Sequence, residues 1–365
     1  MRLFVYAETN KKTSGQRFFL ELALRINTIF NSSFVRSDTI LFNISAPIIK
    51  ILTARLLGKR VSLRVDGLYF DRLSENFINK FSWPVRYMLT VSKSLFGEHL
   101  ACDLANLINK NWVSFVRIFL AHHIIYQSEY CREVHSRYFP KKKSSIIVNG
   151  ANYQLTTLQS KWQKNSTNLI KLITIYDDWR PSKRISDLIE FVRWVNEEKG
   201  ITMLLTLLGY TGKFAQTSPP EIKTIVETRP YFKPLPKFKK FEGDIESALL
   251  ESDIFITFSQ RDACPNIVIE AMAYGLPVVA LASGGLPDIV GDAGVLIHSN
   301  EKNDFFGAAR YEADFSPIDF SEVLLAIMNV MQQIDEFHKQ VRHRFETTLG
   351  MDVVANRYIE SIKKQ

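Results

Sequence analysis

The chain contains few cysteines and no long hydrophobic run. Its 365 residues include three cysteines, at positions 102, 131 and 264, which lack the even count of a disulfide framework and the CxxC spacing of a metal site. No apolar stretch reaches the roughly 20 residues needed to cross a bilayer. The nearest candidate, residues 112–126, is interrupted by one arginine and two histidines. The N-terminal stretch turns polar too early for a signal peptide, so a cytoplasmic protein is expected.

The histidines do not predict a metal site. His338 and His343 are five residues apart, whereas two ligands on one face of a helix are four apart. His122 and His123 are adjacent in an expected strand, so their side chains should point to opposite faces of the sheet. We expect these histidines to be structural and predict no bound metal.

Charge is distributed unequally along the chain. Residues 1–150 contain 22 Lys and Arg against 10 Asp and Glu, and residues 151–365 contain 24 against 28. At about 150 residues per domain, the length suggests two domains, and the opposite signs suggest different partners for them. The basic half favours an anionic partner such as a phospholipid surface, a lipid-linked phosphate or nucleic acid. A merely solvated basic surface is the alternative.

Short apolar runs alternate with helical patterns in both halves, which predicts parallel βαβ units. In the first half, a helix is expected over residues 17–30, and strands are expected at 3–6, 39–42, 60–65, 123–126 and 145–148. In the second half, a helix is expected over residues 185–197, and strands are expected at 169–176, 203–208, 253–258, 278–281 and 295–297.

The polar segment 151–168 is the best linker in the chain. Residues 218–240 are rich in Pro and Lys and are expected to be irregular, and the last sixty residues are expected to be helical. The fold class predicted is α/β, with two doubly wound Rossmann-like domains facing a cleft and a helical C-terminal tail. The first domain is placed at 1–160, the second at 161–345, and a final helix at 346–365 should pack toward the first.

The most informative segment runs from Ser259 to Val279. Pro265 suits the first turn of a helix, and Gly275 suits its C-terminal end. The helix between them is apolar except for Glu270, and a carboxylate in a buried helix requires a hydrogen-bonding partner. This helix follows an expected strand at the carboxyl edge of a parallel sheet, where such folds bind ligands. Its N-terminus would attract phosphate, and Asp262 precedes Glu270 by eight residues. A structural ion pair of Glu270 is the alternative.

This segment resembles the E-x7-E region of retaining glycosyltransferases of the GT-B fold, specifically glycosyltransferase family 4. Other segments resemble that family in the same order along the chain. They are Tyr126 to Tyr130, Val148 to Asn152, Trp179 to Arg184, Ser283 to Val290 and Gly294 to Ile297. The resemblance implies a metal-independent enzyme that moves a sugar from a nucleotide-sugar donor, a UDP- or GDP-sugar, to a glycan or lipid-linked acceptor. It needs no cofactor, and it would serve surface polysaccharide biosynthesis.

The resemblance also implies roles for individual residues in the second domain. Glu270 would accept hydrogen bonds from the ribose hydroxyls, and Asp262 would face the transferred sugar as a catalytic residue. The diphosphate would be bound by cations and by backbone N–H groups at the start of the helix, that is, by Arg180, Lys183, Asn266 and Ile267. The selectivity for base and sugar is expected around residues 209–210 and 233–242. Arg180 and Lys183 also follow an expected strand, where they could neutralise phosphate. The alternative is that they are solvent-exposed residues at the start of a helix, without a role in binding.

Two positions in the first domain complete the expected site. Gly15 lies in the segment that corresponds to the family's glycine-rich turn, and it would let the backbone approach the diphosphate. Asp66 follows an expected strand, where many relatives carry a histidine, and it is predicted to contact the acceptor or the sugar. An ordinary loop glycine and a simple Asp-Gly turn are the alternatives.

Two rival functions remain open at this stage. Another GT-B enzyme, such as a nucleotide-sugar epimerase, would act on a free nucleotide sugar without an acceptor. A non-enzymatic binder of anionic polymers would use the basic half. Because the only tight basic cluster is residues 141–143 and no aromatic-basic RNA motif is present, we predict no nucleic-acid partner.

Residues 77–97 combine aromatic side chains with Lys80, Arg86 and Lys93. After Pro84, a partly amphipathic helical pattern is formed by Val85, Met88, Leu89, Leu95 and Phe96. Such a helix could rest on an anionic membrane surface, which makes a peripheral location on the inner face of the membrane part of the prediction. Packing of its apolar stripe on the first domain is the alternative.

Overall fold

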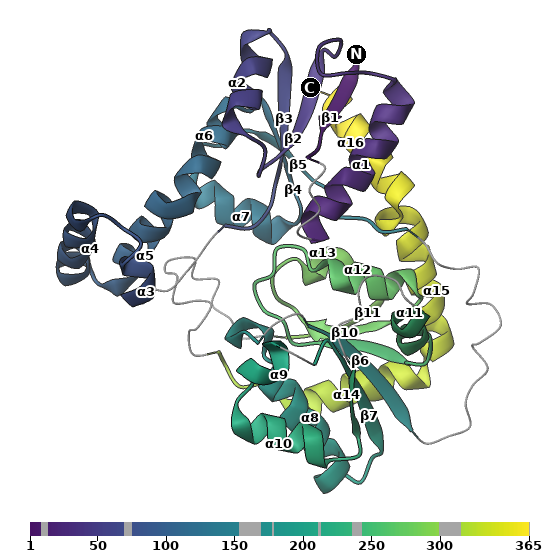
Figure 1. The fold of residues 1–365 in the computed structure, drawn as a ribbon. Helices are drawn as coiled ribbons and strands as arrows, with labels where there is room; N and C mark the ends of the chain where they lie inside the picture. Colours follow the sequence, from purple (N-terminus) through teal and green to yellow (C-terminus); the bar gives the residue numbers. More distant parts are fainter. Residues whose placement is uncertain are drawn as a thin grey trace. The chain divides into compact units, whose positions relative to one another are not determined.

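The computed structural model describes residues 1–8, 14–68, 75–152, 169–176, 179–210, 213–235, 243–298 and 315–364. The chain forms two compact units. The first contains residues 1–149 together with 301–315 and 352–365, and the second contains residues 150–300 and 316–351. Each unit is built around one parallel sheet (Figure 1). The expected linker, residues 151–168, lies outside the described residues except for its first two.

In the described part of the first unit, the sheet has five parallel strands in chain order. These strands are β1 (Leu3–Tyr6), β2 (Thr39–Asn43), β3 (Arg60–Val65), β4 (His123–Tyr126) and β5 (Lys143–Ile146). Strands β2 to β4 are buried almost throughout, as expected for parallel strands covered by helices. The prediction for β5 was displaced by two residues toward the C-terminus, because Ile147 and Val148 are buried apolar residues that continue past the last strand pair.

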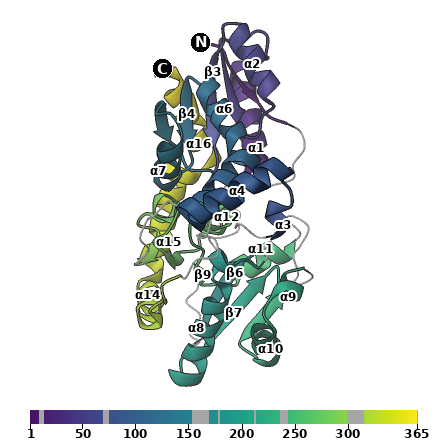
Figure 2. The ribbon, with the colours of Figure 1, turned by 90° about the vertical axis from the view of Figure 1, so that its left-hand side faces the viewer.

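Helices connect these strands and extend the first unit. They are α1 (Ser14–Phe30), α2 (Ile48–Leu56), α3 (Glu75–Ile78), α4 (Trp83–Phe96), α5 (Glu98–Asn106), η1 (Leu107–Asn111), α6 (Trp112–Leu120) and α7 (Glu129–Tyr138). The β3–β4 connection contains α3 to α6. Its α3–α5 part stands away from the sheet (Figures 1 and 2). A small core of its own, formed by Phe77, Leu89 and Ala105, holds this part together.

The second unit is doubly wound, and its described residues form a sheet of six parallel strands in the order β11-β10-β9-β6-β7-β8. Its strands are β6 (Ile170–Ile175), β7 (Met203–Leu208), β8 (Phe232–Leu235), β9 (Ile254–Thr257), β10 (Val278–Leu281) and β11 (Gly294–Ile297). The chain enters the sheet at β6 and winds first toward β8. It then returns to the other side of β6 through β9, so the winding direction reverses between β6 and β9.

The helices of the second unit are η3 (Pro181–Lys183), α8 (Ile185–Glu198), α9 (Lys213–Thr217), α10 (Pro220–Thr228), α11 (Gly243–Leu250), α12 (Asn266–Ala273), α13 (Leu286–Val290), α14 (Phe320–Gln332), α15 (Ile334–Arg344) and η5 (Phe345–Leu349). The last helix, α16 (Met351–Lys363), belongs to the first unit from Asp352 onward. There Arg25 pairs with Asp352 at 2.9 Å, and Ser145 hydrogen-bonds Ser361 at 2.7 Å.

The predicted α/β class, with two units built on parallel sheets and a helical C-terminal region, is confirmed. Double winding was predicted for both sheets but is found only in the second, because the described strands of the first sheet follow one another in chain order without a reversal. The expectation that residues 218–240 are irregular was wrong, since α10 and β8 fall within them. Pro219 and Pro220 mark the start of α10, where the missing N–H has no cost. Pro234 is tolerated because β8 is an edge strand. In the described residues, no helix has the length and apolar character required to cross a membrane.

Candidate active site

The residues predicted to bind the donor gather where the second sheet reverses its winding. Arg180 and Lys183 follow β6, and Asp262 follows β9, its neighbour in the sheet. Carboxyl ends of parallel strands meet at one edge of the sheet, and the point of reversal there is the usual ligand position in open α/β folds.

Lys183 and Asp262 form an ion pair at this edge. Lys183 Nζ lies 2.9 Å from Asp262 Oδ2 and also donates a hydrogen bond to Ser259 Oγ at 3.1 Å. The side chains are 20% and 32% exposed, respectively, so solvent and ligand can still reach both groups. Two residues with different predicted partners, diphosphate and sugar, are therefore in direct contact.

The environment of Asp262 keeps its carboxyl ionised. Burial would raise the pKa of Asp262, but the Lys183 cation, the N–H of Cys264 and the charge of Arg180 together hold that pKa below its usual range. The Cys264 N–H donates to Asp262 Oδ1 at 3.2 Å. A carboxylate beside two cations is suited to accept sugar hydroxyls while the cations remain available to phosphate.

Two hydrogen bonds donated by backbone N–H groups hold the loop that carries Asp262. Gly285 N–H donates to Asp262 O at 2.8 Å, and Arg261 N–H donates to Ser283 Oγ at 3.0 Å. Gly284 has a φ of +61°, and a Cβ there would lie 2.3 Å from Asp262 O. Glycine is thus required at position 284, both for its backbone conformation and for this close approach.

The 3-10 turn that carries Lys183 is joined to the same loop. Gln260 N–H donates to Ser182 O at 2.8 Å, and Tyr176 Oη lies 3.2 Å from Thr257 Oγ1. The β6 and β9 ends therefore form one connected structure. Sequence reasoning assigned no role to Ser259, Ser283 or Gly284, although all three lie within or beside the segments it singled out.

Helix α12 begins just after this loop. Pro265 is its N-cap residue, and Asn266 and Ile267 form its first turn. Glu270 is half-buried, while Val268, Ile269 and Met272 are fully buried. The prediction of a largely buried apolar helix with one carboxylate is confirmed. The charge of Glu270 reaches Tyr274, where it adds to burial and Glu246 in raising the pKa of the phenol.

The two segments expected to select the base and the sugar are residues 209–210 and 233–242. Tyr210 is buried, and its Oη lies 3.5 Å from Ser218 Oγ. Gly209 has a φ of +94°, and a Cβ there would lie 2.0 Å from Tyr176 O. Of the second expected segment, residues 233–242, only 233–235 are described, as part of β8.

Asp66 belongs to a buried polar network in the first unit. Arg64 is fully buried, and its Nη1 lies 2.5 Å from Asp66 Oδ1 and 3.2 Å from Asn43 Oδ1. Its Nη2 donates to Asn149 Oδ1 at 2.8 Å. Gln127 Nε2 also donates to Asp66 Oδ1. The ion pair with Asp66 and the hydrogen bonds of Nη1 and Nη2 offset the cost of burying the guanidinium inside the unit.

Two segments that resemble the glycosyltransferase family, Tyr126 to Tyr130 and Val148 to Asn152, meet the end of β3 in this network. Arg64 and Asp66 stand at the end of β3, Gln127 follows β4, and Asn149 follows β5. Asn149 Nδ2 donates to Gln127 Oε1 at 3.2 Å. Each polar residue of the cluster stands at the end of a parallel strand or shortly after it, at one edge of the sheet. This pattern in the sequence could have revealed the cluster. A small hollow, lined in part by Gln16 and Asn43, adjoins it.

Gly15 is the second residue of α1 and not part of a loop. A Cβ on Gly15 would lie 4.0 Å from Asp66 Oδ2, which is ordinary contact distance. The structure therefore brings Gly15 and Asp66 together. Residues 11–13 of the expected turn lie outside the described part of the chain.

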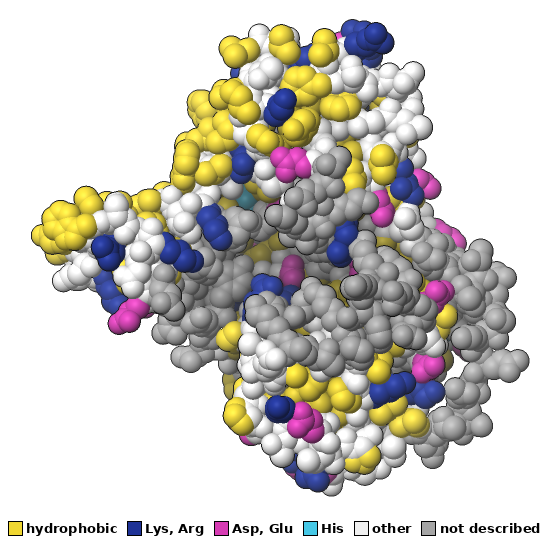
Figure 3. Space-filling model, viewed as in Figure 1, with side chains coloured by type: hydrophobic (Ala, Val, Ile, Leu, Met, Phe, Trp, Pro, Cys, Tyr) yellow, Lys and Arg dark blue, Asp and Glu magenta, His cyan; other side chains and the backbone are white. Residues whose placement is uncertain are grey.

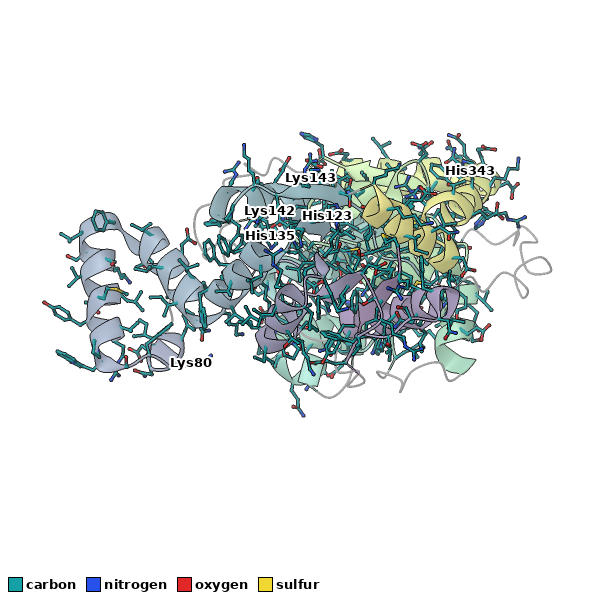
Figure 4. The ribbon with its side chains drawn as sticks, turned by 90° about the horizontal axis from the view of Figure 1, so that it is seen from above. Lys80, His123, His135, Lys142, Lys143 and His343 are labelled. Carbon is teal, nitrogen blue, oxygen red and sulfur yellow. The ribbon has the colours of Figure 1, made fainter. Side chains whose placement is uncertain are left out.

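Two of the buried histidines, His123 and His135, lie in the first unit. Burial lowers the pKa of His123 to about 4, with a smaller effect from Lys143, its neighbour across β4 and β5 (Figure 4). Burial also lowers the pKa of His135 to about 4, and its Nδ1 donates to Cys131 O at 2.7 Å. Within the described ranges, no cluster of three or more His, Cys, Asp or Glu could hold a metal ion.

Sequence comparison places the second unit among known proteins. The model of the family "Glycosyl transferases group 1" matches residues 175–311. The putative colanic acid biosynthesis glycosyltransferase WcaL of Salmonella typhimurium is 32% identical over 127 residues, which cover 34% of this chain and 30% of WcaL. The match thus spans about a third of that relative's length.

Structural comparison covers both units. The sucrose-phosphate synthase of Thermosynechococcus elongatus aligns with a TM-score of 0.56 and 14% identity, over 98% of this chain and 80% of that one. Anabaena HepE, solved in complex with UDP and glucose, aligns with a TM-score of 0.55 and 13% identity, over 100% of this chain and 99% of that one. The chain therefore has the GT-B fold and resembles the group 1 glycosyltransferases, whose family model its second unit matches.

Proposed function

We propose that this chain is a retaining glycosyltransferase of family 4 that moves a sugar from a nucleotide-sugar donor to a glycan or lipid-linked acceptor. The observation that carries the proposal is the Lys183–Asp262 pair beside Arg180 at the reversal point of the second sheet. It combines cations for a diphosphate with a carboxylate for a sugar. The match of residues 175–311 to group 1 glycosyl transferases supports it.

In this proposal the donor is a UDP- or GDP-sugar. Arg180 and Lys183 bind its diphosphate, helped by the N–H groups and dipole at the start of α12 around Asn266 and Ile267. Glu270, one turn further along α12, accepts hydrogen bonds from the ribose hydroxyls. HepE was solved with UDP and glucose, which supports a ligand of this class.

The reaction needs no metal ion or other cofactor in this proposal. The bond between the anomeric carbon and the phosphate oxygen breaks, and the acceptor hydroxyl forms its bond on the same face of the sugar. The acceptor proton passes to the leaving diphosphate. Arg180 and Lys183 stabilise the charge on that group, while Asp262 orients the sugar. In the first unit, Gly15 lets the backbone approach the leaving diphosphate, and Asp66 contacts the acceptor or the sugar.

The pathway proposed is the synthesis of a surface polysaccharide, since the relative WcaL carries the name of a colanic acid biosynthesis glycosyltransferase. The basic first 150 residues suit an anionic membrane surface, so we place the enzyme peripherally on the cytoplasmic face.

Thermal-shift measurements with UDP, GDP, ADP and their common sugars test the donor site, because a bound ligand raises the melting temperature by mass action. One nucleoside diphosphate should stabilise the protein more than the others, with or without EDTA. Release of that diphosphate should require an acceptor. Conversion of the free nucleotide sugar without acceptor would identify an epimerase, and a strict requirement for a divalent metal would contradict the mechanism.

A further inference from the structure

A solvent-exposed apolar surface extends over three helices of the first unit, with no packing partner among the residues that the structure describes. The α4 side chains Trp83, Tyr87, Val91 and Leu95 follow one another at intervals of four residues, so they share one face of the helix. They are 71%, 64%, 36% and 68% exposed, whereas Leu89 on the opposite face is buried in the small core of the β3–β4 connection. Part of the apolar pattern predicted for this helix therefore packs inward, and the larger part faces solvent.

Helices α2 and α6 continue this surface. Exposed apolar side chains recur at intervals of three and four residues on both, at Ile49, Leu52 and Leu56 on α2 and at Trp112, Phe115 and Phe119 on α6. The two helices pack against each other. Figure 3 shows the apolar side chains gathered over these helices and α4. We call the exposed apolar residues of α2, α4 and α6 the apolar ridge.

The charges on the three ridge helices have one sign. Helices α2, α4 and α6 contain Lys50, Arg55, Arg86, Lys93 and Arg117 but no Asp or Glu. One carboxylate lies next to them, since Glu98 at the start of α5 pairs with Lys93 at 3.1 Å. Large exposed apolar patches mark binding sites for proteins or membranes, and a patch whose own helices carry mainly cations matches the negative charge of an anionic lipid surface.

The aromatic residues favour the same partner. Trp83 and Tyr87 stack at 6.1 Å between ring centroids at the start of α4, and Trp112 starts α6. Tryptophan and tyrosine are enriched where proteins cross the headgroup region of a bilayer. An amphipathic helix with cations beside a Trp- and Leu-containing face lies in that region with its apolar side inserted.

From these observations we propose that the apolar ridge inserts into the headgroup region of an anionic bilayer, with α4 as its principal anchor. The inference deepens the proposed membrane location but does not depend on the proposed reaction. Insertion adds an apolar contribution to the electrostatic attraction of the basic unit, so removing apolar side chains should abolish binding even though every cation remains.

Vesicle co-sedimentation of the full chain tests the proposal, using phosphatidylcholine alone and phosphatidylcholine mixed with phosphatidylglycerol. The wild type should bind the mixed vesicles, more weakly at high salt. The double substitution Leu95→Ser and Phe96→Ser should lower the partition coefficient at least ten-fold with an unchanged melting temperature, because both side chains project into solvent. Arg86→Glu with Lys93→Glu should lower it about five-fold or more per cation.

The matched control is Leu325→Ser, which removes a 70% exposed leucine from α14 of the second unit and should leave vesicle binding unchanged. Binding of the Leu95→Ser and Phe96→Ser variant at the wild-type level would overturn the proposal. So would a wild-type chain that ignores both vesicles but forms dimers in sedimentation velocity that this variant loses, since the ridge would then be a contact between two copies. Because no donor or acceptor is present, neither result depends on the proposed reaction, which is tested separately with a soluble acceptor.

Discussion

Lys183 Nζ lies 2.9 Å from Asp262 Oδ2, so the cation expected at the diphosphate and the carboxylate expected at the sugar neutralise each other when no donor is present. A bound diphosphate would compete with Asp262 for Lys183. The two residues should therefore have opposite effects on diphosphate affinity.

Replacing either partner of this pair separates binding from turnover. Lys183→Ala removes a charged hydrogen bond worth about 1.5–3 kcal/mol, and we expect a ten-fold or larger loss of affinity for the nucleoside diphosphate with little change for the nucleoside. Asp262→Asn should bind the diphosphate as well as the wild type or better, while turnover falls. Calorimetry and steady-state kinetics provide the two readouts. A weaker diphosphate complex of Asp262→Asn would contradict competition within the pair.

Arg180→Ala should also weaken diphosphate binding more than nucleoside binding, because Arg180 contributes charge beside Asp262. Calorimetric titration with both ligands measures the difference. Equal losses for nucleoside and diphosphate would place Arg180 near the base. Arg193→Ala on α8 is the control, since Arg193 is engaged by Glu190 and Glu197.

Glu270→Gln keeps the size of the side chain but removes the charge that we propose accepts hydrogen bonds from the ribose hydroxyls. We expect affinity for the nucleotide sugar to fall about ten-fold, in line with the lower end of 1.5–3 kcal/mol for hydrogen bonds to charged groups. The melting temperature of the ligand-free protein should change little, because Glu270 is half-buried. Wild-type affinity together with wild-type turnover would remove Glu270 from the site.

Gly284→Ala should damage the loop that carries Asp262. The substitution combines a positive φ with a Cβ placed 2.3 Å from Asp262 O. Gly200→Ala is the matched control in the same unit, because Gly200 has a φ of +65° but open space around its Cβ position. The control should cost about 1 kcal/mol of unfolding free energy, and Gly284→Ala should cost more and also weaken diphosphate binding. Equal losses in chemical denaturation would show that the close approach is unimportant.

Stability should decrease as the pH falls from about 6.5 to about 4. In the folded protein the pKa of His135 is lowered to about 4 by burial, whereas an unfolded histidine titrates near 6.5. The unfolded chain therefore binds the proton first, and the loss from His135 approaches about 3 kcal/mol at the acid end. Denaturation of His135→Gln across this range should show a shallower pH dependence. His343→Gln, at an exposed position, should follow the wild type.

The predicted bounds agree with the observed ones for some strands and helices and not for others. The strands β3, β4, β7 and β10 were predicted with the bounds that the structure has, because short apolar runs between turn residues identify buried parallel strands. Strand β8 was missed, since Lys233 and Pro234 obscure the pattern of an edge strand. Gly15 was expected in a loop but is the second residue of helix α1, because the residues after it have a strong helical periodicity.

The residues of the candidate site also divide into some that the sequence indicated and some that it did not. Four candidate residues could be found from the sequence: Arg180, Lys183, Asp262 and Glu270. Each either follows a strand or lies inside an apolar helix, where a charged side chain requires a partner. Of the Arg64 network, only Asp66 was singled out, because its members lie far apart in the chain: Asn149 follows Arg64 by 85 residues. Only the parallel register of β3, β4 and β5 brings their carboxyl ends together.

The sequence by itself therefore determined the α/β class and singled out the residues proposed to bind the donor, since hydrophobic periodicity and local motifs act over a few residues. Tertiary structure decided which charges pair, as in Lys183 with Asp262 and Arg64 with Asp66, because those contacts depend on strand order. It also decided that most of α4 faces solvent. An amphipathic pattern shows that a helix has an apolar face, but only the packing of Leu89 against Phe77 and Ala105 shows which part of that face is already covered.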